Sequence, residues 1–186
     1  MTVFLAYFMR KLQNDELHRI SVDEFKVKKK NPYVLLLDNV RSMHNVGSAF
    51  RTADAFLAQK IYLCGITGTP PHREITKTAL GATESVAWEY MRDSLSVIKQ
   101  LKTEGYIIIS VEQAENSTSL FNFQTKADSK YCFIFGNEVF GVQQELIAAS
   151  DNCLEIPQFG TKHSLNIAVS IGIVVWDYLT KAGSVS

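Results

Sequence analysis

Side chains that could bind or activate a ligand gather at the entrance to the most apolar segment of the chain. Lys162, His163 and Ser164 directly precede the apolar run Leu165–Thr180, and Asn166 lies just inside it. Ser164 is suited to cap a helix, because its hydroxyl can accept a hydrogen bond from a free backbone N–H. Capping does not explain Asn166, since asparagine is a poor residue inside a helix. We therefore expect Asn166 to face a polar ligand.

Two further segments carry similar groups. In LLLDNVRSMHNVGSAFRTADAF an apolar strand ends at Asp38, and Asn45 and Arg51 follow in or beside a helix. Arg51 is either an ordinary surface arginine or a cation that reaches back to the loop. In IFGNEVFGV a second strand runs into Gly136, where a glycine lets the backbone approach a ligand closely. Glu138, two residues later, is either a helix cap or a site carboxylate.

These segments lie within alternating strands and helices. Short apolar runs without polar alternation are typical of parallel strands covered on both faces. The expected strands are Tyr33–Asp38, Lys60–Cys64, Tyr106–Val111, Tyr131–Phe135 and Cys153–Ile156. The expected helices are Leu12–Phe25, Val46–Leu57, Ser94–Lys102, Gln143–Ala149 and Leu165–Thr180. The sequence thus predicts an α/β protein whose polar segments meet at the carboxyl edge of a parallel sheet, where ligands of open α/β sheets bind.

Composition excludes several classes of protein. The 19 Lys and Arg balance 19 Asp and Glu, which argues against a surface coated in basic residues but permits a local basic patch. No apolar run reaches the roughly 20 residues of a membrane-spanning helix. The cysteines Cys64, Cys132 and Cys153 lack metal-ligand spacing and predict buried free thiols in a reducing cytoplasm. GxGxxG and GxSxG are missing, and GNEVFG lacks the lysine of a P-loop, which argues against dinucleotide oxidoreductases, NTPases and α/β-hydrolases.

The N-terminal residues are expected to form an extension. In MTVFLAYFMRKL the charges follow the apolar stretch, and no small-residue cleavage site appears, so a signal peptide is not favoured. Met9 is an alternative start, which would make the first eight residues a mis-assigned extension. Residues 1–32 would then be a helical extension with a basic linker, and residues 33–186 the main domain.

Taken in order, the three polar segments resemble the motifs of the TrmH (SpoU) branch of the SPOUT superfamily, RNA methyltransferases that modify ribose 2′-hydroxyls. The first motif is a strand followed by Asn45 and Arg51, the second is FGNEVFG, and the third is IPQFGTKHSLNIAVSIG. The resemblance covers roughly residues 33–180. It implies a parallel sheet flanked by helices with a deep C-terminal trefoil knot, a rare feature that periodicity does not reveal. It also implies a homodimer in which Leu165–Thr180 packs at the interface.

The resemblance also implies a cofactor and site residues. S-adenosylmethionine would lie in a bent shape among the knot loops, with Ile156–Ser164 as a loop over it. The implied cofactor-binding residues are Val111, Gly136, Asn137, Glu138, Ile156, Ser164 and Leu165. The implied catalytic residues are Arg51, Asn45, Glu138, Ser164 and Asn166. No metal ion is expected.

Methyl transfer to a ribose oxygen requires alignment of the reacting atoms and stabilisation of charge that develops on that oxygen. Guanidinium stays protonated in proteins, so we expect Arg51 to bind the adjacent phosphate and stabilise the oxyanion, and we expect Glu138 to orient Arg51. The residues expected to contact RNA phosphate are Arg41, His44, Arg73 and Lys77, with Lys28–Lys30 as an auxiliary stretch.

Two alternatives stay open. One is a non-catalytic relative that binds RNA or senses the cofactor, and the other is an enzyme that methylates a base nitrogen. The motifs favour the ribose, and the short chain slightly favours tRNA over rRNA as the substrate.

Overall fold

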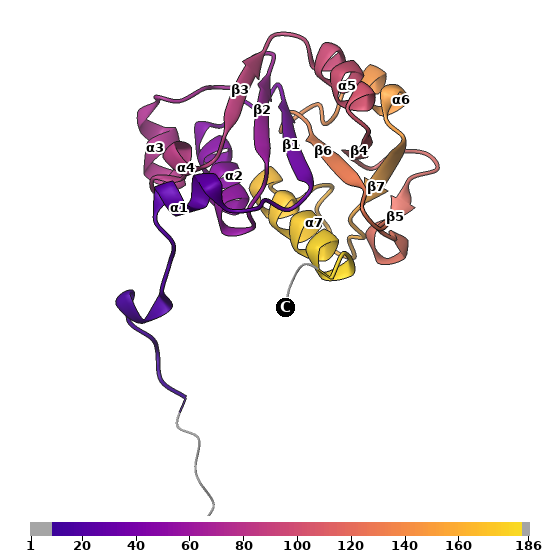
Figure 1. Cartoon of the computed structure of the whole chain (residues 1–186). Helices are drawn as coiled ribbons and strands as arrows, with labels where there is room; N and C mark the ends of the chain where they lie inside the picture. Colours follow the sequence, from indigo (N-terminus) through magenta and orange to yellow (C-terminus); the bar gives the residue numbers. More distant parts are fainter. Residues whose placement is uncertain (1–8, 184–186) are drawn as a thin grey trace, which may run out of the picture.

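The chain folds around one parallel sheet, seen in a computed structural model that describes residues 9–183; the predictions for the first eight residues lie outside this range. Within this range seven strands follow the order β3-β2-β1-β6-β4-β7-β5 (Figure 1). The strands are β1 (Tyr33–Asp38), β2 (Lys60–Cys64), β3 (Trp88–Met91), β4 (Tyr106–Val111), β5 (Thr118–Ser119), β6 (Lys130–Phe135) and β7 (Asn152–Glu155). The α-helices are α1 (Val22–Val27), α2 (Met43–Ala55), α3 (Arg73–Ala79), α4 (Ala82–Ser85), α5 (Ser94–Thr103), α6 (Gln144–Ala149) and α7 (Ile167–Lys181).

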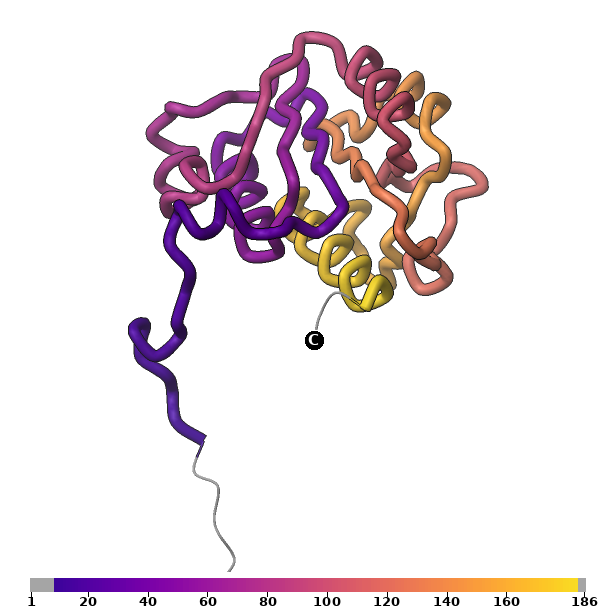
Figure 2. Tube along the Cα trace, in the orientation of Figure 1, coloured from indigo at the N-terminus to yellow at the C-terminus, as the bar shows by residue number. Residues whose placement is uncertain are grey.

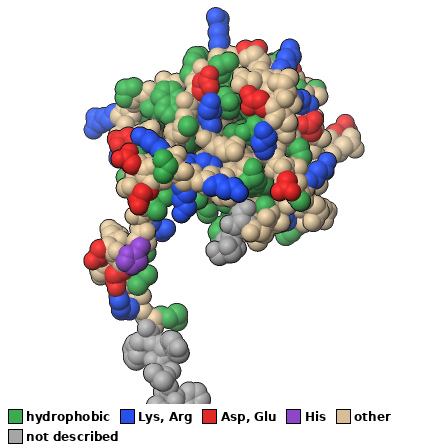
Figure 3. All heavy atoms as spheres, viewed as in Figure 1, with side chains coloured by type: hydrophobic (Ala, Val, Ile, Leu, Met, Phe, Trp, Pro, Cys, Tyr) green, Lys and Arg blue, Asp and Glu red, His purple; other side chains and the backbone are tan. Residues whose placement is uncertain are grey.

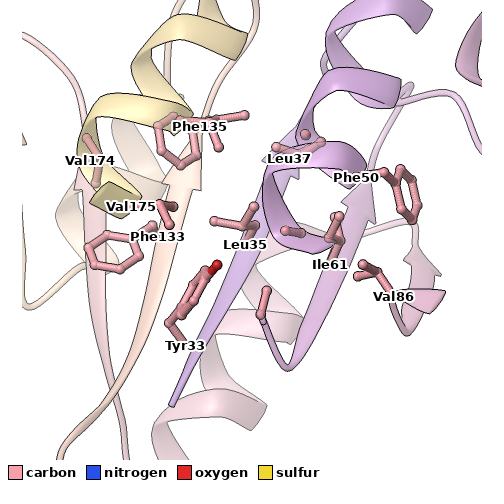
Figure 4. Close-up of a cluster of buried hydrophobic side chains, with 14 of the residues drawn as sticks. Tyr33, Leu35, Leu37, Phe50, Ile61, Val86, Phe133, Phe135, Val174 and Val175 are labelled. Carbon is pink, nitrogen blue, oxygen red and sulfur yellow. The ribbon is translucent and has the colours of Figure 1, made fainter. Parts of the chain in front are cut away.

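The sheet is buried on both faces, as its apolar strands predict. Along β1, Tyr33, Leu35 and Leu37 join a cluster with α2 and α7, whereas Val34 and Leu36 join a cluster with α5 and α6. This alternation is the ordinary consequence of successive strand side chains pointing to opposite faces. Figure 1 accordingly shows α5 and α6 together on one side of the sheet and α7 on the other. Figure 4 shows the first cluster, where side chains of β1, β2 and β6 meet those of α2 and α7.

Two edge strands were not predicted. β3 ends one side of the sheet, and its sequence WEYM is partly exposed and carries a glutamate. β5 ends the other side and consists of two residues paired with β7. Edge strands are half solvated and short, so they lack the continuous apolar run that identifies a central strand.

The predicted helix Leu12–Phe25 is wrong. The chain instead forms a 3₁₀ turn at Asp15–Leu17, and α1 starts afresh after Ser21. Ser21 and Glu24 form a reciprocal capping box, in which each side chain bonds the other's backbone N–H. Phe25 is buried in the main core, whereas the chain of residues 9–20 extends away from the body (Figure 2). The division at residue 32 stays a prediction.

The two helices that matter most for the site also begin elsewhere than predicted. α2 begins at Met43, three residues before the predicted start, because the Ser42 hydroxyl caps it by accepting a hydrogen bond from the Asn45 N–H. α7 begins at Ile167, and its cap is Asn166 rather than Ser164. In residues 9–183 no helix is long and apolar enough to cross a membrane.

Strand pairing explains why distant motifs meet. β1 pairs in parallel with β6, with Leu37 opposite Phe135. The loops that follow these two strands therefore leave the same edge of the sheet side by side. β6 also separates β1 from β4, although β4 precedes it in the chain. The carboxyl edge at β1 and β6 is thus a switch point of the strand order, the usual place for a ligand site in an α/β sheet.

The segment between β4 and β6 holds both ends of the C-terminal helical segment. The Gln113 side chain donates a hydrogen bond to the His163 carbonyl oxygen (2.6 Å), before α7. The Lys181 ammonium donates to the Leu120 carbonyl oxygen (2.5 Å), at the end of α7. These contacts are consistent with a helix that passes through a loop formed by this segment. The trefoil knot itself stays a prediction.

Candidate functional site

The carboxylate of Glu138, in the second motif, is hydrogen-bonded to the first motif. It accepts hydrogen bonds from the backbone N–H groups of Arg41 and Ser42 and from the Asn45 side-chain amide, each at 2.9 Å. The donors lie at the start of α2, where N–H groups have no partner within the helix and the helix dipole favours a negative charge. Glu138, which follows β6, is therefore an anion bound at the N-terminus of α2, the helix that follows β1.

The third motif joins this junction through Asn45. The Asn45 side-chain oxygen accepts a hydrogen bond from the Asn166 side-chain amide (3.2 Å). The Asn166 side-chain oxygen in turn accepts from the Ala168 N–H (2.9 Å) and caps α7. The chain Glu138–Asn45–Asn166 thus links one residue from each motif. Capping accounts for Asn166 and not for Ser164, so the expectation for Ser164 as the cap is wrong.

A tight hairpin of residues 136–142 carries Glu138. The backbone groups of Asn137 and Gly141 bond to each other twice, at 2.9 and 3.0 Å. A Cβ at Gly136 would lie 2.2 Å from the Gly141 backbone, so only glycine permits this approach. Gly141 has a φ of +67°, and a Cβ there would also meet the Glu112 carboxylate at 2.1 Å. The two glycines of the second motif therefore serve the hairpin itself.

A cleft of about 730 Å³ opens beside this hairpin. This volume lies within the usual range for small-molecule and cofactor sites. All seven predicted cofactor residues line it, namely Val111, Gly136, Asn137, Glu138, Ile156, Ser164 and Leu165. Asn166 lines it as well. Within the described residues, the loop backbone of 158–165 donates no hydrogen bond to another protein group, so its N–H groups are available to a ligand.

Sequence reasoning missed two residues that shape the cleft. The Glu112 carboxylate accepts a hydrogen bond from the Val142 N–H (2.9 Å), and Gln113 holds the His163 carbonyl on the other loop. Both side chains line the cleft. They follow β4 at the same carboxyl edge, so extending the edge argument to every strand end would have identified them.

Arg51 does not join the chain of hydrogen bonds. It lies on an exposed part of α2 and lines a separate hollow of about 310 Å³ with Phe25 and Ser85. Six residues along an α-helix correspond to about 600°, which places Arg51 some 120° around the helix from Asn45 and about 9 Å along it. The prediction that Glu138 hydrogen-bonds Arg51 is therefore wrong within a single chain. Glu138 instead accepts hydrogen bonds from the backbone N–H groups of Arg41 and Ser42 at the start of α2.

The four predicted RNA-contacting residues lie on neighbouring elements. Arg41 and His44 stand at the start of α2, and Arg73 and Lys77 lie on α3, which packs against α2. All four are exposed. His44 is paired with Glu74, which lowers the pKa of that carboxyl. On the face shown in Figure 3, positive and negative side chains are intermixed, in keeping with the balanced composition.

The environment of Glu138 sets its ionisation. Partial burial opposes the charge, but the hydrogen bonds from Arg41, Ser42 and Asn45 together outweigh burial and hold the pKa of Glu138 below its usual value. A lowered folded-state pKa means that the carboxylate stabilises the fold above its unfolded pKa of about 4.3. This contribution is lost as the pH falls through and below that value.

We expect Glu138→Gln to flatten the pH dependence of stability. Between about pH 5 and pH 3 the free energy of unfolding of the wild type should fall more steeply than that of the variant, because the amide does not titrate. Urea unfolding at several pH values measures both slopes, and far-UV circular dichroism checks that the variant folds. Equal slopes for the two proteins would contradict the assigned role of the carboxylate.

Comparison with known proteins places this site in a family. A model described as the SpoU rRNA Methylase family matches residues 32–176. A 23S rRNA (guanosine-2′-O-)-methyltransferase RlmB of Neisseria meningitidis serogroup B is 30% identical over 77% of this chain and 56% of that protein. A tRNA (guanosine(18)-2′-O)-methyltransferase TARBP1 of Mus musculus is 32% identical over 72% of this chain and 8% of that protein. The chain therefore spans 56% or less of the length of these two relatives.

A solved structure agrees in fold. The AdoMet-bound rRNA methyltransferase from Sinorhizobium meliloti superposes with a TM-score of 0.76 at 26% identity, over 82% of this chain and 57% of that one. The family match covers most of the sequence, including all three motifs. This chain belongs to the SpoU methylase family.

Proposed function

We propose that this chain is an S-adenosylmethionine-dependent methyltransferase that acts on a ribose 2′-hydroxyl of RNA. The observation that carries the proposal is one cleft lined by every residue that the resemblance implies for the cofactor. The second and third motifs line this cleft, and the first motif is hydrogen-bonded to both of them through Asn45. The relatives named above, which are guanosine 2′-O-methyltransferases of tRNA and of 23S rRNA, support the same chemistry.

The cleft fits the proposed cofactor. Its volume of about 730 Å³ accommodates a nucleoside with an amino acid side arm. Of the loop 158–165, Gln158, His163, Ser164 and Leu165 line the cleft, and their N–H groups are available to hydrogen-bond the polar edge of a base or ribose. Ile156 and Leu165 offer apolar contact. When bound, S-adenosylmethionine supplies a methyl group activated by a sulfonium. The residues of this chain bind it, orient it and exclude water.

The hydrogen-bonded chain positions the reacting groups. Asn45 is buried and uses both ends of its amide, so its orientation is fixed by Glu138 and Asn166. Asn166 lines the cleft and is held at the start of α7. A fixed amide beside the cleft suits the alignment that an in-line displacement needs. We assign Arg51 to the phosphate next to the target ribose and to the charge that develops on the attacking oxygen.

We further propose a homodimer formed through α7. Leu165, Val169, Ile173 and Trp176 leave between 37% and 51% of their surface exposed. Their spacing of four, four and three residues places them on one side of the α7 segment. Leu165 also lines the cleft, so the apolar stripe runs from the cleft along the helix. A second copy that covers the stripe would border the cleft.

A dimer of this kind gives Arg51 a role. α2 lies against α7, and the Phe56 and Trp176 rings are 5.9 Å apart between centroids. Arg51 precedes Phe56 by five residues on α2 and is exposed, on the side of the helix that lines the hollow with Phe25 and Ser85. Because Arg51 does not reach the cleft of its own chain, we propose that it serves the cleft of the partner subunit.

The remaining assignments follow from the family. We propose that the C-terminal segment forms the trefoil knot, supported by the bonds from Gln113 to His163 and from Lys181 to Leu120, which tie the two ends of that segment to the chain between β4 and β6. We propose residues 33–186 as the methyltransferase unit and the preceding residues as an extension. The buried free thiols of Cys64, Cys132 and Cys153 support a reducing compartment such as the cytoplasm.

Methyl incorporation tests the function. We expect purified protein to transfer label from S-adenosylmethionine to small RNA or ribosomal RNA from cells lacking this gene, and to create alkali-resistant linkages. Arg51→Ala should slow transfer by about 10²-fold or more, since a charge-stabilising donor is lost. Label without alkali resistance would indicate base methylation, and cofactor binding without label in either RNA would favour a non-catalytic protein.

Mixed dimers test the shared site. Arg51→Ala removes the guanidinium, and Ser164→Trp fills the cleft of its own chain. If Arg51 serves the partner, mixing the two inactive variants should restore about a quarter of wild-type activity, because half of the dimers are mixed and each has one complete site. A mixture as inactive as its components, under conditions where subunits exchange, would show that Arg51 acts within its own chain.

A further inference from the structure

The tip of the 136–142 hairpin presents an exposed aromatic ring at the cleft. Phe140 lines the cleft and yet leaves 83% of its surface exposed. Val139 beside it is 67% exposed. A phenylalanine in water lacks the stabilisation that burial of its apolar surface would give it. An occupant that covers the ring would regain that contact.

The backbone that carries this ring is rigid. The Asn137 side-chain oxygen accepts hydrogen bonds from the N–H groups of Val139 (2.9 Å) and Phe140 (3.1 Å). The paired backbone groups of Asn137 and Gly141 close the hairpin on either side. The Asn137 amide also donates to the Asn39 carbonyl oxygen (2.8 Å), which anchors the hairpin to the loop after β1. The backbone position of Phe140 is therefore set before any ligand arrives.

An arginine lies on the loop that adjoins this hairpin. The Arg41 N–H bonds the carboxylate of Glu138, which precedes Phe140 by two residues. The Arg41 side chain is exposed. An exposed guanidinium and an exposed aromatic ring on adjoining loops match the two parts of a nucleotide, since the first binds phosphate and the second stacks on a base.

We propose that Phe140 is a stacking platform for a nucleobase of the RNA substrate, next to the ribose that is methylated. The inference rests on the proposed function and adds a residue that binds the substrate. A ribose 2′-hydroxyl must be presented to the cleft, and single-stranded nucleotides are commonly held by stacking unstacked bases on aromatic side chains. Stacking on one ring tolerates every base, so Phe140 contributes affinity and placement more than base identity.

Alanine and tryptophan variants of Phe140 test the platform. Phe140→Ala should raise the KM for RNA by about 5- to 150-fold, the loss of one base–aromatic stack, and leave the Kd for S-adenosylmethionine unchanged. Phe140→Trp should keep the wild-type KM for RNA. Phe121→Ala is the matched control, because Phe121 is 75% exposed and does not line the cleft.

The readouts separate the competing explanations. The RNA is total small RNA or ribosomal RNA, whichever the wild type labels. An unchanged KM for RNA in Phe140→Ala, a weaker Kd for the cofactor with no change for RNA, or a shift to monomer in size-exclusion chromatography would each overturn the platform. If the wild type labels no RNA, the proposed function itself fails, and the platform fails with it.

Discussion

The carboxylate of Glu138 is the constraint on which the arrangement of this site depends. It draws together the end of β6 and the start of α2, two places 93 or more residues apart in sequence. Hydrogen bonds to a charged group stabilise more than neutral ones, about 1.5–3 kcal/mol each. The same bonds orient Asn45, and Asn45 in turn orients Asn166 at the start of α7. One anion therefore fixes the relative position of three loops.

The sheet makes this junction available. Because β1 and β6 are neighbours, the loops after them emerge side by side, and no long side chain is needed to connect them. Glu112 and Gln113 extend the same principle to β4, where each holds one of the two loops that border the cleft. The cleft is thus built from the ends of adjacent strands, and the rigid strands determine how the loops are placed.

Much of this arrangement is predictable from the sequence. The central strands have apolar runs that only a doubly covered sheet explains, and β1, β2 and β4 have the predicted bounds. The residues predicted to bind the cofactor come from the resemblance to the family; all seven line the cleft, and their role stays a prediction. The edge strand β3 was missed, since one side of it is not covered by a neighbouring strand.

One error arose where a tertiary contact decides the local structure, and two arose where a local signal in the sequence was not used. Asn166 is a weak residue inside a helix, but Asn45 gives its amide a partner, and it becomes the cap. Arg51 is close to Asn45 in sequence, but the turn of the helix directs it elsewhere. Leu12–Phe25 has a helical pattern, but Ser21 and Glu24 start a separate helix, and only Phe25 finds a core to enter. Only the Asn45 partner of Asn166 is absent from the local sequence, whereas the capping box and the helical offset of Arg51 can be derived from it.

A double-mutant cycle between Asn45 and Glu138 would test the central claim most directly. The free energy of unfolding would be measured for the wild type, Asn45→Ala, Glu138→Ala and the double variant. If the side chains are joined by a charge-assisted hydrogen bond, the coupling free energy should be about 1–2 kcal/mol. Additive effects, within about 0.3 kcal/mol, would show that Glu138 and Asn45 act independently and that the three motifs are held together by something else.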